Sequence, residues 1–160
     1  MAMHYLGGIK LIAACSSPCR QAIAGLLKPH FFERQERIDL FGHICVIERG
    51  TVIRGGTVYA QGGNWGLDMI MSLESLWQRL PVKCLTHTEI LTLGRQDLFD
   101  IVQRHPEEMR RFRRAAACLA LRRVVTIYHS EKRSGIFLPE TEWIHRLFHS
   151  SRSWSHEVQA

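Results

Sequence analysis

The chain has 160 residues, of which 46% are apolar and 22% are charged, which is the composition of a globular protein of one domain. A chain of this length buries about two thirds of the surface that it exposes when unfolded. No run of about 18 apolar residues exists, which excludes a membrane-spanning helix, and the apolar patch near the N-terminus is too short for a signal peptide.

The net charge is +6, and a group of arginines on one predicted helix contributes much of it. Such a group attracts nucleic acid or anionic lipid, but it is also typical of a solvated helix face or of a face that meets an acidic partner. The sequence leaves these interpretations open, and the solvated face is the simplest. The arginines are Arg110, Arg111, Arg113, Arg114, Arg122 and Arg123.

Five cysteines are dispersed along the chain without a Cys-x-x-Cys pair. An odd, dispersed set is typical of a reducing compartment, in which buried thiols act as small apolar side chains. We therefore expect a cytoplasmic chain without disulfides.

Short helices are expected first. Residues 9–15 predict one or two helical turns. Ser16 or Ser17, followed by Pro18, predicts a hydroxyl-capped helix that ends before Pro29.

Residues 31–93 alternate short β-branched runs with glycines. This pattern predicts a rolled antiparallel sheet of about eight short strands rather than a parallel sheet. The continuous apolar run from Ile44 to Ile47 predicts a fully buried strand, and Gly55-Gly56 predicts a two-residue hairpin turn. Residues 67–77 change to a helical spacing, which predicts a short helix within an insert at residues 64–80, between two strands.

Two helices are expected to close the domain, at residues 96–104 and 106–130. Pro106 is followed by Glu107 and Glu108, which favour the start of a helix. Residues 131–160 predict a linker, a short helix near 142–148 and a disordered serine-rich tail. We therefore expect an α+β domain at residues 1–130 and a separate segment at 131–160.

Four passages carry a resemblance to a known family. Residues 46–50 (VIERG) look like one of its strands, residues 63–70 (GNWGLDMI) like the start of its phosphate-binding cassette, and residues 82–93 like the strand pair after the cassette. Residues 96–106, with the arginine-rich helix, look like its closing helices. Together these passages resemble the cyclic-nucleotide-binding domain, a jelly-roll-like β-roll, over roughly residues 9–128. The sequence is most similar to the homology domain of ether-à-go-go-type and cyclic-nucleotide-gated cation channels of protists.

The resemblance implies a non-enzymatic regulatory domain, the cytosolic C-terminal part of a voltage- or ligand-gated potassium or cation channel. Such a domain lies at the inner face of a membrane and has no cofactor. The implied partners are the transmembrane region of the channel or a neighbouring subunit, a cyclic nucleotide, and anionic lipid at the arginine-rich helix. Nucleic acid is not expected, because residues 131–160 are too short and irregular for a helix-turn-helix.

The resemblance also places the ligand-binding residues. The glycine–glutamate pair of the family falls on Gly66-Leu67, where leucine cannot accept a ribose hydrogen bond and Asp68 comes one position late. The phosphate-binding arginine falls on Gln78, next to Arg79. These departures predict a degenerate pocket, empty or filled by its own chain. The alternative is a working cyclic AMP or cyclic GMP sensor, or a kinase regulatory module, with a variant cassette. The predicted ligand-binding residues are Trp65, Gly66, Leu67, Asp68, Met69, Gln78, Arg79, Leu80 and Val82.

No catalytic or metal-binding residues are predicted. His145 and His149 have a spacing that suits a metal, but no acid or cysteine nearby in the sequence completes a site. Glu107 and Glu108 are expected to act as helix-start acids rather than as a catalytic pair.

Overall fold

Short strands separated by glycines fold residues 28–94 into two four-stranded antiparallel sheets. The computed structural model describes residues 6–147. The first sheet has the order β1 (Lys28–Phe32), β8 (Thr88–Gly94), β3 (His43–Arg49) and β6 (Asn64–Trp65). The second has the order β2 (Arg37–Ile38), β7 (Val82–Cys84), β4 (Val52–Arg54) and β5 (Thr57–Tyr59). The predicted α+β roll of short antiparallel strands is confirmed.

The apolar run on β3 is buried on both faces of its sheet, as predicted. Ile44 and Val46 pack against the helices, whereas Cys45 and Ile47 face the interior of the roll. A strand covered on both sides needs apolar residues at every position, which explains why this run does not alternate.

The hairpin predicted at Gly55-Gly56 is also confirmed. Both glycines have positive φ angles, of 54° and 82°, and Arg54 on β4 pairs with Thr57 on β5. Two consecutive positive φ angles are what a two-residue hairpin turn requires.

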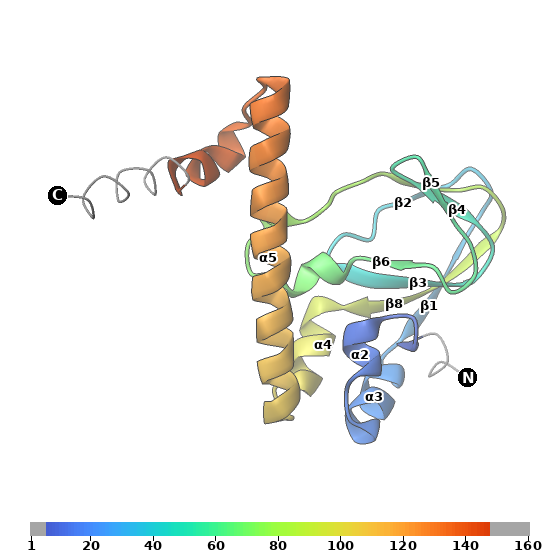
Figure 1. The fold of residues 1–160 in the computed structure, drawn as a ribbon. Helices are drawn as coiled ribbons and strands as arrows, with labels where there is room; N and C mark the ends of the chain where they lie inside the picture. Colours follow the sequence, from blue (N-terminus) through green and yellow to red (C-terminus); the bar gives the residue numbers. More distant parts are fainter. Residues whose placement is uncertain (1–5, 148–160) are drawn as a thin grey trace.

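Four helices pack along one side of the roll: α2 (Lys10–Ala13), α3 (Ser17–Ala24), α4 (Arg95–Val102) and the long α5 (Pro106–Ser134) (Figure 1). The predicted hydroxyl cap of α3 is wrong, because Ser16 makes no side-chain hydrogen bond to the helix. Its backbone N–H instead donates to Glu108 Oε1 at 2.7 Å, which ties α3 to α5. Among residues 6–147, no helix is both long and apolar enough to cross a membrane.

The prediction of one continuous helix at residues 67–77 is wrong. After β6, the chain forms two 3₁₀ turns, η1 (Leu67–Ile70) and η2 (Glu74–Leu76). Met71 and Leu73 between them adopt extended backbone, which breaks the helical spacing seen in the sequence. Met71 stays there because its carbonyl accepts a hydrogen bond from Trp77 Nε1 at 3.2 Å.

The linker predicted at residues 131–135 is wrong over its first four residues. The helix α5 continues to Ser134 and ends at Gly135, whose φ is 70°. The chain then turns through η3 (Pro139–Thr141) into a helix at residues 142–147, which confirms the predicted short helix as far as the structure describes it. Phe148, His149 and the predicted disordered tail lie outside the described residues.

Candidate functional site

A small pocket lies inside the roll, where both ends of the inserted segment meet the second sheet. Its cavity volume is about 30 Å³, room for about two water molecules. A groove between the inserted segment, α4 and α5 measures about 390 Å³ on the same scale. The pocket inside the roll therefore has little free volume. The pocket is lined by Ile38, Leu40, Phe41, Gly42, His43, Arg54, Trp65, Gly66, Asp68, Trp77, Gln78, Arg79, Leu80 and Val82.

Gly66 fixes the start of the inserted segment against β3. Its φ is 90°, and a Cβ built on it would lie 1.9 Å from the carbonyl oxygen of His43. No other residue fits here, because both the backbone conformation and the close approach exclude a side chain.

The backbone of Gln78 is held from two sides. The carboxylate of Asp68 accepts a hydrogen bond from the N–H of Gln78, and the carbonyl of Gln78 accepts one from Arg54 Nη2 at 3.1 Å. Asp68 begins the inserted segment and Gln78 ends it, whereas Arg54 comes from β4. The first bond closes the segment on itself and engages the carboxylate that would have had to replace the missing ribose acceptor, and the second ties the segment to β4.

Trp77 forms a wall of the pocket and is held there by its neighbours. Its ring passes so close to Gly42 that a Cβ on this glycine would lie 3.5 Å from it. Arg95 lies over the Trp77 ring, with its guanidinium carbon 6.0 Å from the ring centroid, and donates to the carbonyl of Met69 at 2.8 Å. The beginning of α4 thus supports the wall from behind.

Arg54 is the residue that the sequence analysis missed. Its side chain is only 8% exposed, and its Nε is buried without a hydrogen-bond partner among the described residues. Strand alternation would have found it: Val52 and Arg54 are buried, whereas Ile53 between them is partly exposed. A charged residue two positions after an inward-facing valine also faces inward.

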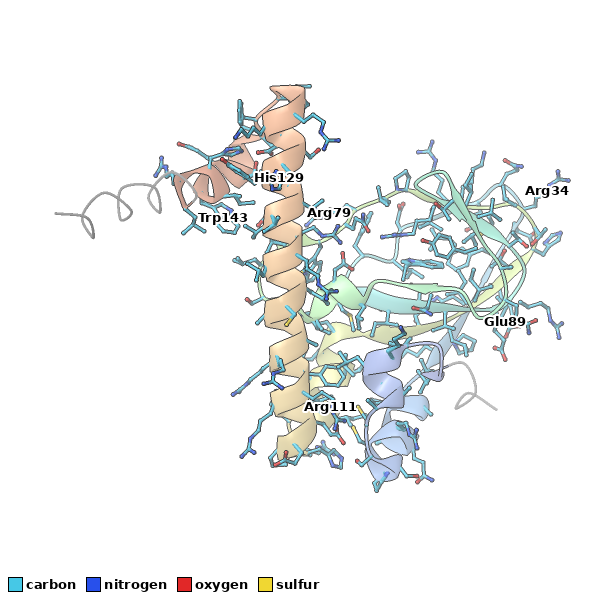
Figure 2. All side chains as sticks on the ribbon, viewed as in Figure 1. Arg34, Arg79, Glu89, Arg111, His129 and Trp143 are labelled. Carbon is cyan, nitrogen blue, oxygen red and sulfur yellow. The ribbon has the colours of Figure 1, made fainter. Side chains whose placement is uncertain are left out.

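Seven of the nine predicted ligand-binding residues line this pocket: Trp65, Gly66, Asp68, Gln78, Arg79, Leu80 and Val82. The other two do not, because Met69 is buried in the core beside the helices and Leu67 packs against the same core. Arg79 is exposed at the rim, where its closest acid is Glu74 at 3.5 Å (Figure 2).

The inserted segment is also the contact between the roll and the C-terminal helices. Met71 and Leu76 are buried together with Ile144, in a cluster that includes Leu119 and Ile127 of α5. A displacement of the segment therefore reaches both α5 and the helix at residues 142–147.

His145, which is not expected to bind a metal, has a hydrogen-bond partner in the protein. His145 Nε2 hydrogen-bonds to Glu131 Oε2 at 2.5 Å, and His149 lies outside the described residues. Between Leu6 and Leu147, no group of three or more His, Cys, Asp and Glu side chains is arranged to hold a metal ion.

No protein-family model and no curated protein matches this sequence. Solved structures do resemble the fold. A cyclic nucleotide-binding-like protein from Brucella abortus is 14% identical, with a TM-score of 0.53, over 64% of this chain and 97% of that one. The N-terminal domain of a transcriptional regulator from Streptomyces coelicolor is 18% identical, with a TM-score of 0.54, over 67% of this chain and 85% of that one.

These comparisons define the fold class. The chain has the cyclic-nucleotide-binding-like fold, with the roll, the inserted segment and the closing helices in the expected order. At these identities the likeness shows the fold, and it agrees with the resemblance in the sequence at that level.

Proposed function

We propose that this chain is a non-enzymatic regulatory domain of the cyclic-nucleotide-binding type whose pocket is closed by its own residues. It transmits movement between the roll and α5 rather than reporting a bound nucleotide. The observation that carries this proposal is the pair of hydrogen bonds at the Gln78 backbone, whose N–H donates to Asp68 and whose carbonyl accepts from Arg54. The cavity beside them measures about 30 Å³.

The loss of the ribose acceptor supports the closed pocket. At the position of the family's glutamate, Leu67 packs against the core, and Asp68 is occupied by Gln78. A nucleotide that entered would bury its ribose hydroxyl without this partner, at a cost of about 1–3 kcal/mol.

The packing of the inserted segment supports the coupling role. Met71 and Leu76 share a buried cluster with Leu119 and Ile144. A movement of the inserted segment is therefore passed to α5 and to the helix at residues 142–147. The resemblance to channel domains implies that this movement acts on a pore at the inner face of a membrane. Any effector must still bind one arrangement more tightly than the other to shift it.

Thermal unfolding with cyclic AMP and cyclic GMP tests the closed pocket. Ligand at 100-fold its dissociation constant adds about 2.7 kcal/mol and raises the Tm of a chain this size by roughly 5–10 °C. We expect no shift with either nucleotide at millimolar concentration. A shift at micromolar concentration would instead support the alternative, a working sensor with a variant cassette.

Hydrogen exchange tests the coupling. Asp68→Ala removes the bond to Gln78 and should speed amide exchange in the part of α5 that carries Leu119 and Ile127. Arg34→Ala, in an exposed turn at the far end of the roll, is the matched control and should leave α5 unchanged (Figure 2). Equal exchange in α5 for both variants would contradict the coupling.

The exposed arginines of α5 support a second contact, with anionic lipid. Arg110, Arg111, Arg113, Arg114 and Arg122 are exposed. Arg110 pairs with Glu107 at 3.0 Å, and Arg111 is engaged with Glu108 and the carbonyl of Ala14. A surface of this kind binds phosphatidylserine vesicles electrostatically. Sedimentation with such vesicles should show binding in low salt that disappears at about 1 M salt, where the Debye length is about 3 Å. Salt-resistant binding, or none, would exclude this contact.

A further inference from the structure

Arg54 occupies a position at which a charged side chain is costly. It stands on β4 two residues after Val52, faces the interior of the roll and is 8% exposed. A buried guanidinium has lost the water that stabilised its charge, and proteins keep such a group only when it is paired.

The described part of the protein does not supply the pair. Among residues 6–147, the Arg54 guanidinium has one hydrogen-bond acceptor, the neutral carbonyl of Gln78, and it forms no ion pair with a carboxylate within 4.0 Å. Its Nε has no acceptor in this part of the chain. The guanidinium therefore has free donor capacity inside the pocket.

Two groups near Arg54 are candidate counter-ions, and neither forms an ion pair with it. Asp68 lines the same pocket, but its carboxylate accepts from the N–H of Gln78 and makes no ion pair with the Arg54 guanidinium within 4.0 Å. Burial raises the pKa of Cys45 to about 12, although the charge of Arg54 acts in the opposite direction. The Cys45 thiol is thus neutral at physiological pH and does not balance the arginine.

We propose that the roll pocket binds a small oxyanion of the phosphate type, held by Arg54. A guanidinium offers donors in a planar fork that matches the oxygens of such an anion. Arg79 lines the same pocket, is exposed and pairs with Glu74 at 3.5 Å, so its side chain can turn toward the anion. The cavity suits a group of a few atoms and not a nucleoside.

This proposal names a ligand for the pocket of the proposed function. It rests on the proposed function in one respect, the exclusion of a nucleoside from that pocket. In the family, the positive charge that meets the phosphate lies on the inserted segment, whereas here Arg54 on β4 of the second sheet supplies it. The anion would add a third contact to the closed segment, so its concentration would set how firmly the segment holds α5.

The experiment is thermal unfolding of the full chain in inorganic phosphate, with ionic strength held constant by sodium chloride. We expect the Tm to rise with the logarithm of the phosphate concentration once this exceeds the dissociation constant, by roughly 3–5 °C at ten times that constant. The shift should vanish in Arg54→Met. It should persist in Arg34→Gln, and in the double variant Arg113→Gln with Arg114→Gln, which tests phosphate bound on α5.

Arg54→Met should remain folded, because an apolar side chain of similar length suits a buried site better than an unpaired charge. If Arg54→Met does not fold, Arg54→Lys is the second variant. Lysine keeps the charge but loses the planar fork of donors, so Arg54→Lys should weaken phosphate binding without abolishing it. An equal shift in wild type and Arg54→Met would overturn the assignment, as would the absence of any shift in the wild type.

Cyclic AMP, cyclic GMP and adenosine form the remaining arms. A free phosphate site predicts stabilisation by phosphate and none by the nucleotides or adenosine. Stabilisation by a cyclic nucleotide that Arg54→Met removes would overturn the closed pocket while leaving Arg54 as the anion-binding residue. No effect of any of these compounds would overturn the oxyanion site and leave the closed pocket standing.

Discussion

Glu131 and His145 are bound to each other inside the C-terminal part of the molecule. The carboxylate of Glu131, on the last turn of α5, lies 2.5 Å from His145 Nε2 and also accepts hydrogen bonds from the hydroxyl of Thr141 and the N–H of Leu138. Glu131 is 6% exposed. One carboxylate therefore holds the returning chain, from Leu138 to His145, against the end of α5.

This arrangement predicts a loss of stability in acid. Burial acts to raise the pKa of Glu131, but the hydrogen bonds from Thr141, His145 and Leu138 outweigh it, so the pKa lies below its ordinary value of 4.5. A carboxylate with a lowered pKa stabilises the fold above that ordinary value, and the contribution is lost as the pH falls through the folded value. We expect the Tm to be level above pH 5 and to fall below about pH 4.5.

Glu131→Gln tests the origin of the acid effect. It should lower the free energy of unfolding at pH 7 by about 1–3 kcal/mol and flatten the dependence of the Tm on pH. Glu108, whose pKa is lowered against burial by Ser16 and Arg111, contributes to the acid dependence that remains. The exposed Glu142→Gln is the control. An unchanged pH profile in Glu131→Gln would show that this cluster does not set the acid limit.

Gly66 provides a second prediction, with a matched control in the same roll. Gly66→Ala must combine a φ of 90° with a Cβ 1.9 Å from the carbonyl of His43, whereas Gly56→Ala has a similar φ of 82° and open space around it. We expect Gly56→Ala to lose about 1–2 kcal/mol and Gly66→Ala at least twice as much. Urea unfolding measures both. Equal losses would show that β3 and the inserted segment separate at little cost.

The sequence predicted the sheets better than the segment that forms the pocket. Strand positions such as Ile44 to Ile47 follow from residue type and alternation, because burial on one or two faces leaves a periodic signal. The inserted segment carried a helical spacing, yet Trp77 bonds the carbonyl of Met71 and Asp68 bonds the N–H of Gln78. These contacts across turns decide its conformation, and no local pattern encodes them.

Arg54 is different, because a local pattern does carry its orientation. Alternation on β4 puts Arg54 on the same face as Val52, but beside Gly55-Gly56 it also has the pattern of a polar residue entering a turn. The charged residue of the pocket thus comes from a strand, and the passages that carried the family resemblance do not include it.

The cysteines give the last prediction, which separates the buried thiols from the exposed one. Burial raises the pKa of Cys15 and Cys45 to about 12 and raises that of Cys19 and Cys84, whereas Cys118 on α5 is exposed. At pH 8 a thiol of pKa 12 is about one part in ten thousand thiolate, the form that reacts. Mass spectrometry after iodoacetamide should show one adduct on the native protein, removed by Cys118→Ser, and five adducts after unfolding. Early labelling of Cys15 or Cys19 would show that α2 and α3 leave α5 in the native state, and that the bond between Ser16 and Glu108 does not hold them.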